Sequence, residues 1–289
     1  MTVLTLGVVT GAIYGLIAVG IVLVYRGTKV INFAQGEIGT FSLYLAWFVT
    51  TEHGFPWWAG AVAAIGGATL LGVAFEFCVV RRMVAASRLS VAVATIGLAS
   101  MLLAVELKAW GVTPRTLRGP VEGAGVKVGV VYVTPTQLIS LAVLAVTGVG
   151  LAVLLRSTDF GLGVLAAADD PTAVRLVGVR LSRVSAFTWG AGAALASVAA
   201  LLLEPTIRTF TPDYAGRLFV AGLVAALVGG LSSLPGAFAG GIVVGVIEAY
   251  VKQRTLTSTV SGLSTLAMFA LILLVLLVRP RGLLGKAAG

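Results

Sequence analysis

The sequence predicts an all-α, polytopic helical membrane protein with about eight or nine transmembrane helices, some of them short or broken. Of its 289 residues, 58% are hydrophobic and only 11% are charged, whereas soluble domains carry about 25% charged residues. Most of the chain runs in long apolar stretches without Asp, Glu, Lys or Arg. Because the strands of outer-membrane barrels alternate apolar and polar residues, these stretches favour helices over a barrel and exclude a soluble globule.

A helix needs about 20 residues to cross a hydrocarbon core about 30 Å thick. Eight stretches lack charged residues, and all but the second are long enough to cross: 1–25, 38–51, 53–75, 89–105, 128–155, 184–203, 218–247 and 255–278. The first stretch has no basic start, so we expect a retained helix and not a cleaved signal peptide. The stretch 218–247 contains Gly229-Gly230 and Leu234-Pro235-Gly236 in its middle. Because Pro removes a helical donor and Gly loosens the backbone, this stretch is expected to break into two helices.

The net charge of +9 comes from basic residues that flank the apolar runs, so it indicates topology and not a nucleic-acid partner. If the segment 156–183 is cytoplasmic and 218–247 is split, nine crossings place the amino end outside and the tail inside. The inner loops then hold 12 basic residues and the outer loops 8, which is the expected bias. The longest loop, about 111–134, is external, and residues 1–289 form a single transmembrane domain.

Sequence motifs for catalysis are missing. The only Gly-Lys pair, Gly285-Lys286, precedes Ala287, so any ATPase must be another chain. One histidine, His53, and one cysteine, Cys78, leave no zinc site or disulfide. We therefore expect a chain that is not an enzyme and binds no cofactor.

Five glutamates lie at or near the ends of the apolar stretches: Glu37, Glu76, Glu106, Glu204 and Glu248. The membrane centre is therefore expected to be uncharged. This pattern argues against a carrier driven by protons or sodium, because such carriers usually place an ionisable residue inside the bilayer.

The segment 156–183 contains the signals of a short helix at 171–177. Asp170 can cap its start, Pro171 suits its first position, and Gly178 can form the left-handed turn that ends it. Ala173, Leu176 and Val177 would then lie along one side, outside the membrane. This apolar side favours contact with a partner protein, and the alternative is a loop helix that lies back on its own bundle.

This segment, with Gly161, Ala166, Asp170-Pro171, Ala173 and Gly178, resembles the coupling loop in permease subunits of branched-chain amino acid ABC importers. The resemblance covers nearly the whole chain, in four segments: Gly11 to Leu16, Asn32 to Glu37, Gly229 to Ala237 and Arg279 to Gly285. Two departures are Leu162 and Leu165, which stand where the family has basic residues, and Ser232, which replaces a glycine.

The resemblance implies the ABC importer permease fold in a plasma (cell inner) membrane. It implies a second permease subunit, two cytoplasmic ATP-binding subunits that use the ATP, and an extracytoplasmic substrate-binding protein. The residues expected to couple to the ATPase are Gly161, Ala166, Asp170, Pro171, Ala173, Arg175, Leu176 and Gly178.

Short or broken helices often line the substrate path of transporters. The candidate path residues are accordingly Asn32, Gln35, Glu37, Gly229, Gly230, Pro235 and Gly236. The alternative for the first three is that they only satisfy a re-entrant turn. An uncharged path suits branched-chain amino acids; urea or short amides are the alternative solutes, and an ATP-independent carrier or channel is the alternative mechanism.

Gly7, Gly11 and Gly15 recur every four residues. This spacing allows close helix packing inside the subunit, with a seam between two permeases as the alternative.

Overall fold

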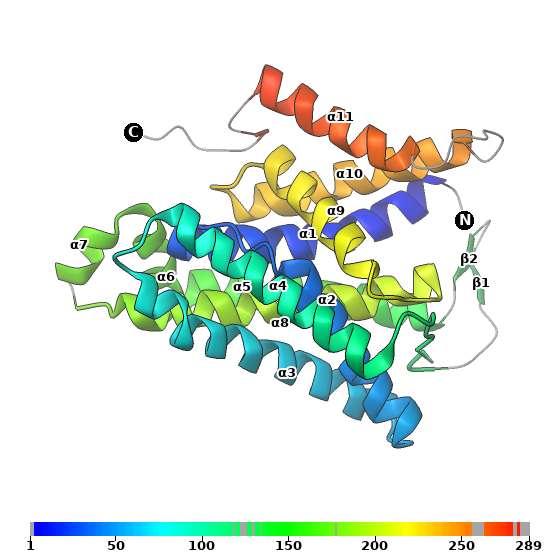
Figure 1. Ribbon diagram of the computed structural model, residues 1–289. Coiled ribbons are helices and arrows are strands. Elements are labelled where there is room, and N and C mark those ends of the chain that lie inside the picture. The colour runs from blue at the N-terminus through cyan, green and yellow to red at the C-terminus, as the bar shows by residue number, and fades with distance from the viewer. Residues whose placement is uncertain are drawn as a thin grey trace.

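The computed structural model describes residues 3–117, 119–121, 126–128, 131–133, 135–176, 178–255, 263–279 and 282–283. This part of the chain is a bundle of apolar helices, as predicted (Figure 1). Six of its helices are long and apolar enough to cross a membrane. These six are α1 (Val3–Thr28), α3 (Trp57–Cys78, continued by a 3-10 turn over Val80–Met83), α4 (Arg88–Trp110), α5 (Pro135–Ser157), α8 (Leu181–Ile207) and α10 (Leu234–Thr255).

Three shorter apolar helices complete the bundle: α2 (Gln35–Trp47), α9 (Tyr214–Gly229) and α11 (Leu263–Val278). A π-helical turn, Phe48–Glu52, extends α2. Between α9 and α10 the chain turns at Gly230, whose φ of 102° is accessible mainly to glycine. The backbone N–H of Gly236 donates to the Ser233 hydroxyl at 3.0 Å, which caps α10. The predicted break in 218–247 is therefore confirmed.

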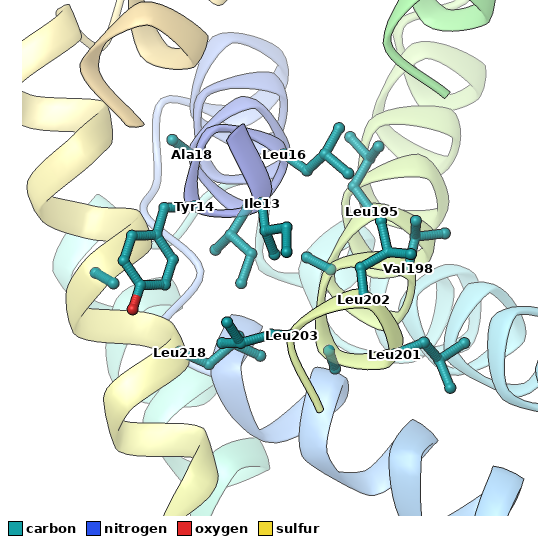
Figure 2. Packing of buried hydrophobic residues seen from close by; sticks show 14 of the residues in the cluster. Ile13, Tyr14, Leu16, Ala18, Leu195, Val198, Leu201, Leu202, Leu203 and Leu218 are labelled. Atoms are coloured by element: carbon teal, nitrogen blue, oxygen red, sulfur yellow. The ribbon is translucent and has the colours of Figure 1, made fainter. Parts of the chain in front are cut away.

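Small residues let α1 sit at the centre of the bundle. A Cβ on Gly11 would lie 2.7 Å from the carbonyl oxygen of Gly241 in α10, and a Cβ on Gly7 would lie 2.8 Å from the Cα of Val246. The glycine spacing on α1 therefore serves packing inside this chain. On another side of α1, Ile13 and Leu16 pack with Leu195 of α8 (Figure 2).

Two further helices, α6 (Asp159–Asp169) and α7 (Pro171–Leu176), lie at one end of the bundle, and the carboxyl end of α11 lies at the same end (Figure 1). Arg26, near the end of α1, forms an ion pair with Asp169 at 3.1 Å, and Arg81 donates to the carbonyl oxygen of Ser182. The start of α1 and the strands of the loop before α5 lie at the other end (Figure 1). The two ends correspond to the two sides of the predicted topology, and after that prediction we name the end with α6 and α7 the cytoplasmic end.

The sequence analysis did not predict α6. The hydroxyl of Thr158 accepts a hydrogen bond from the Gly161 N–H at 2.9 Å and caps this helix. Two glycines, Gly161 and Gly163, lower the intrinsic helix propensity of this segment, so the sequence pattern did not indicate a helix. Packing against α5 favours the helix nevertheless, because Gly161 lies directly against the backbone of Leu154 and Leu155.

The external loop also differs from the irregular segment that we expected. Two short antiparallel strands, β1 (Val126–Val128) and β2 (Val131–Val133), pair within it, with Val126 opposite Val133. Their valines favour strands. Nearer α4, Arg115 pairs with Phe210 as an isolated bridge, and the N–H of Leu117 donates to the carboxylate of Glu204 at 3.1 Å. The loop is thereby fastened to the outer end of α8.

Candidate coupling surface and translocation path

The helix predicted at 171–177 is present as α7, Pro171–Leu176, and Val177 lies outside the described residues. Asp170 caps it, because its Oδ1 accepts hydrogen bonds from the N–H groups of Thr172 and Ala173 at 2.9 and 3.0 Å. Gly178 has a φ of +86°, as its predicted role at the end of the helix requires. The local structure predicted for this segment is therefore confirmed.

The two sides of α7 face different surroundings. Val174 is 6% exposed and packs inward, whereas Leu176 is 86% exposed and Ala173 and Arg175 are also exposed. The helix rests on its own bundle through Val174 and presents Leu176 to the solvent, and contact of Leu176 with a partner protein stays a prediction.

The helix α6 adds to this surface. Ala166, Leu162 and Phe160 are exposed, while Gly161 is buried against α5. The carbonyl oxygen of Ala166 accepts from the N–H of Asp170 at 2.9 Å, which links the two helices. We name the exposed residues Phe160, Leu162 and Leu176 the coupling surface. This surface is apolar, and the predicted topology places its segment outside the membrane, where exposed apolar side chains are unusual.

The inner sides of α6 and α7 join the membrane helices in one hydrophobic cluster. Val164 and Ala167 of α6 and Val174 of α7 pack there with residues of α1, α5 and α8, namely Leu23, Leu155 and Val184. Leu234, at the start of α10, packs against the same cluster. A displacement of the coupling surface would therefore act directly on several membrane helices.

The predicted path residues Asn32 and Gln35 form hydrogen bonds with each other and with the backbone of the protein. Asn32 Nδ2 donates to Gln35 Oε1 at 3.1 Å, Asn32 Oδ1 accepts from the Ala34 N–H at 3.0 Å, and Gln35 Nε2 donates to the Gly192 carbonyl of α8 at 2.7 Å. Both side chains are buried. This geometry supports the alternative that they stabilise the re-entrant turn before α2. Whether they also touch a solute stays a prediction.

Glu37 differs from these two amides. It lies in the first turn of α2 and is partly exposed, and its Oε2 has no hydrogen-bond partner among the described residues. The neighbouring Gly36 lies directly against Ala215 at the start of α9.

The glycines of the broken span lie at the opposite end of α9. Gly229 and Gly236 contact each other closely there, and Gly282 packs against Gly230. Pro235 is exposed. The structure therefore separates the two predicted parts of the path by the length of α9.

An apolar cavity of about 200 Å³ lies between α3, α5 and α8. Its lining includes Trp57, Val143 and Leu202 but none of the predicted path residues.

Glu248 directly follows the apolar stretch 218–247, but it does not lie at the end of its helix. Because α10 continues to Thr255, Glu248 lies well inside it and is only 3% exposed. The carboxylate accepts from the Tyr14 hydroxyl at 2.7 Å and pairs with Arg217 at 3.1 Å and with Lys252 at 2.6 Å. The i,i+4 spacing to Lys252 was the available sequence signal; the contacts with Tyr14 and Arg217 need the tertiary structure.

Glu76, Glu106 and Glu204 are also buried inside the bundle. Glu76 pairs with Arg81 at 2.9 Å and Glu204 accepts from Leu117. Glu106, by contrast, has no hydrogen-bond partner among the described residues for either carboxylate oxygen.

A bundle with six helices long and apolar enough to cross a membrane indicates a multi-pass membrane protein. The family model described as "Branched-chain amino acid transport system / permease component" matches residues 3–278. The chain belongs to this family.

Its curated relatives include the high-affinity branched-chain amino acid transport system permease protein LivH of Escherichia coli, which is 32% identical over 97% of this chain and 94% of the relative. The BraD permease protein of the corresponding system in Pseudomonas aeruginosa is 28% identical over the same shares of the two chains. A probable LivH permease protein of Methanocaldococcus jannaschii is 26% identical over 93% of this chain and 88% of the relative. No solved structure matches the chain significantly.

Proposed function

We propose that this chain is the membrane-spanning permease subunit of an ABC importer and that it moves branched-chain amino acids across the plasma (cell inner) membrane. The observation that carries the proposal is the coupling surface, which exposes Leu176 at the cytoplasmic end while Val174 joins the cluster of α1, α5 and α8. Exposed apolar side chains outside the membrane favour a protein partner. We infer that this partner is a cytoplasmic ATP-binding subunit, and membership in a family of transport-system permease components supports the inference.

In this mechanism the chain performs no chemistry and binds no cofactor, and the ATP is used by two partner subunits. Closure of the ATP-binding subunits would displace α6 and α7. Because these helices share a hydrophobic cluster with α1, α5 and α8, the displacement would shift the membrane helices between inward and outward access.

The remaining partners follow from the same assignment. A second permease subunit would complete the path, and an extracytoplasmic binding protein would deliver the solute at the end where Leu117 fastens the external loop to Glu204. The substrate class is supported by the relatives, which are named for branched-chain amino acid transport. No observation favours urea or short amides.

Uptake by the reconstituted complex tests this function. Proteoliposomes that contain both permeases and both ATP-binding subunits, with the binding protein present on the extracytoplasmic side of the membrane, should take up labelled leucine only when ATP reaches the ATP-binding subunits. Lysine and glutamate should be excluded, because a net ion costs several kcal/mol or more to desolvate in an apolar path. Urea uptake without leucine uptake would reassign the substrate, and leucine uptake without ATP would overturn the importer mechanism.

A further inference from the structure

Glu106 differs from the other buried glutamates in its surroundings. It is 0% exposed, and among the described residues neither carboxylate oxygen has a hydrogen-bond partner. Glu76, Glu204 and Glu248 are buried as well, yet each receives at least one donor from the protein. A buried carboxylate without a donor is costly and is usually retained for a ligand or a function.

The position of Glu106 on α4 indicates which helices would form such a ligand site. The buried residues of α4 form a single stripe that faces the bundle: Val91, Thr95, Leu98, Leu102 and Glu106. Thr95 in the same stripe accepts from the N–H of Phe33 in the re-entrant turn. Glu106 therefore lies on the side of α4 that contacts α2 and the turn, and not on the side that faces the lipid or another subunit.

In the described part of the chain, two polar groups of α2 also lack a hydrogen-bond partner. Tyr44 is fully buried and its hydroxyl has no partner among the described residues, and Oε2 of Glu37 has none either. Tyr44 stacks on Trp110, which follows Glu106 by one helical turn, so Tyr44 and Glu106 lie close together between α2 and α4. Glu37 and Tyr44 are seven residues apart and so lie on one side of α2. Two carboxyl groups and one hydroxyl of these two helices thus have oxygens without a donor among the described residues.

The remaining charged groups nearby do not supply that donor. Asp213 interacts with Glu37 and adds negative charge. Arg115 makes no hydrogen bond to these groups: its guanidinium stacks on the ring of Trp47 at 4.3 Å, one of its terminal nitrogens donates to the carbonyl oxygen of Trp110 at 3.2 Å, and its Nε has no hydrogen-bond partner among the described residues.

Aromatic rings form the walls around these acceptors. The ring of Tyr44 stacks on Trp110 at 4.9 Å, and Phe41 lies 6.0 Å from the same ring. Carboxylates combined with aromatic faces suit an ammonium group, which donates hydrogen bonds and is attracted to π-systems. A metal ion of the calcium type would need six to eight oxygen ligands.

We propose that Glu106, Glu37 and Tyr44 bind the ammonium group of the transported amino acid when α2 and α4 separate during the transport cycle. This inference rests on the proposed function and specifies which atoms recognise its substrate. In the conformation described here Glu106 and Tyr44 are fully buried, so the ammonium reaches them only with a movement of α4 relative to α2.

Substitutions that preserve shape test the proposal. Glu106→Gln keeps the volume and removes the charge, so it would be tolerated if Glu106 were a neutral, purely structural acid. We expect it to lower ATP-driven leucine uptake about tenfold or more, because a charge-assisted hydrogen bond to the ammonium is lost. Tyr44→Phe, which removes one hydroxyl, should lower uptake less. The matched control is Glu204→Gln, at a buried glutamate that already has a protein donor, and it should leave uptake near the wild-type rate.

A binding measurement separates this inference from the proposed function. The complex in nanodiscs, without the binding protein, should bind labelled 3-methylbutylamine, which carries the ammonium of leucine but no carboxylate. Glu106→Gln should weaken this binding about tenfold, and 4-methylpentanoate should not compete.

Wild-type leucine uptake together with unchanged uptake and amine binding in Glu106→Gln would overturn the ammonium site and leave the importer intact. If Glu106→Gln does not assemble with its partners, Tyr44→Phe decides in the same two assays. Failure of the wild type to import leucine would instead refute the proposed function, and the amine measurement would still decide whether Glu106 holds an ammonium group.

Discussion

At the residue scale, Asp170 and Leu176 have separate tasks in the coupling surface. Asp170 holds the first turn of α7 through two hydrogen bonds, and a helix of six residues cannot persist without such help. Replacing Asp170 with Ala removes a cap worth about 1 kcal/mol, and the amount of ATP-binding subunit that copurifies with the permease should fall. Asp170→Asn is the matched control, since its side-chain oxygen can still cap. Equal loss in both variants would show that the charge matters and not the cap.

Leu176 offers a sharper test of docking. Its side chain is 86% exposed, so Leu176→Asp cannot disturb the core, but it places a charge on the apolar coupling surface. Copurification with the ATP-binding subunit and leucine uptake should both fall, while membrane insertion stays normal. The control is Val112→Asp, at a residue that is 70% exposed at the opposite end of the bundle. Full activity of Leu176→Asp would remove α7 from the coupling mechanism.

Residue-level prediction succeeded where the determinants are local. The cap at Asp170 and the turn at Gly178 depend on a few neighbouring residues, and both are present. The inward side of α7 was not predicted, because Val174 is buried by residues from α1, α5 and α8, which no local pattern specifies. The burial of Glu106 and Glu248 was missed for the same reason: a charge near the end of an apolar stretch has the same sequence pattern whether the tertiary structure buries or exposes it.

At the element scale, the contact between α1 and α10 depends on glycines that allow the backbones to touch. A methyl group on Gly11 would lie 2.7 Å from backbone atoms of Gly241 and Ile242, and backbone cannot move aside as a side chain can. We expect Gly11→Ala to destabilise the protein by about 1–3 kcal/mol, seen as a lower unfolding temperature in detergent.

The matched control for Gly11→Ala is Gly66→Ala in α3. A Cβ at Gly66 would meet no atom within 4 Å, and alanine favours a helix by about 0.5–1 kcal/mol over glycine. Gly66→Ala should therefore keep or raise the unfolding temperature. A neutral result for Gly11→Ala would mean that α1 and α10 are not in such close contact.

Elements defined by long apolar stretches were predictable, as were the break between α9 and α10 and the short helix α7. The helix α6 and the strands β1 and β2 were not. In α6 the two glycines argued against a helix, and the contact of Gly161 with α5 outweighed that preference. The strands are three residues each, too short for a periodic pattern to stand out.

At the scale of the whole molecule, the bundle places the apolar coupling surface and the external loop at opposite ends. The helices α6 and α7 lie at the same end as the carboxyl end of α11, and the start of α1 lies at the same end as the strands β1 and β2 (Figure 1). The ion pair of Arg26 with Asp169 and the hydrogen bond from Arg81 to Ser182 connect α1, α3, α6 and α8 at the cytoplasmic end. Because these contacts hold the helices together at this end, showing which side of the membrane it faces would fix the orientation of the whole chain.

Single cysteines provide the test of that orientation. Cys78, the only cysteine, is exposed, so Cys78→Ser supplies a background without thiols. We expect Arg88→Cys and Arg175→Cys to be protected from an impermeant thiol reagent in intact cells and labelled after the membrane is opened, because basic residues favour the cytoplasmic side. Val112→Cys and His53→Cys lie at exposed positions near the other end and should be labelled in intact cells. Labelling of Arg175→Cys in intact cells, with Val112→Cys protected, would show that the topology is the reverse of the predicted one. The coupling surface would then be out of reach of any cytoplasmic ATPase.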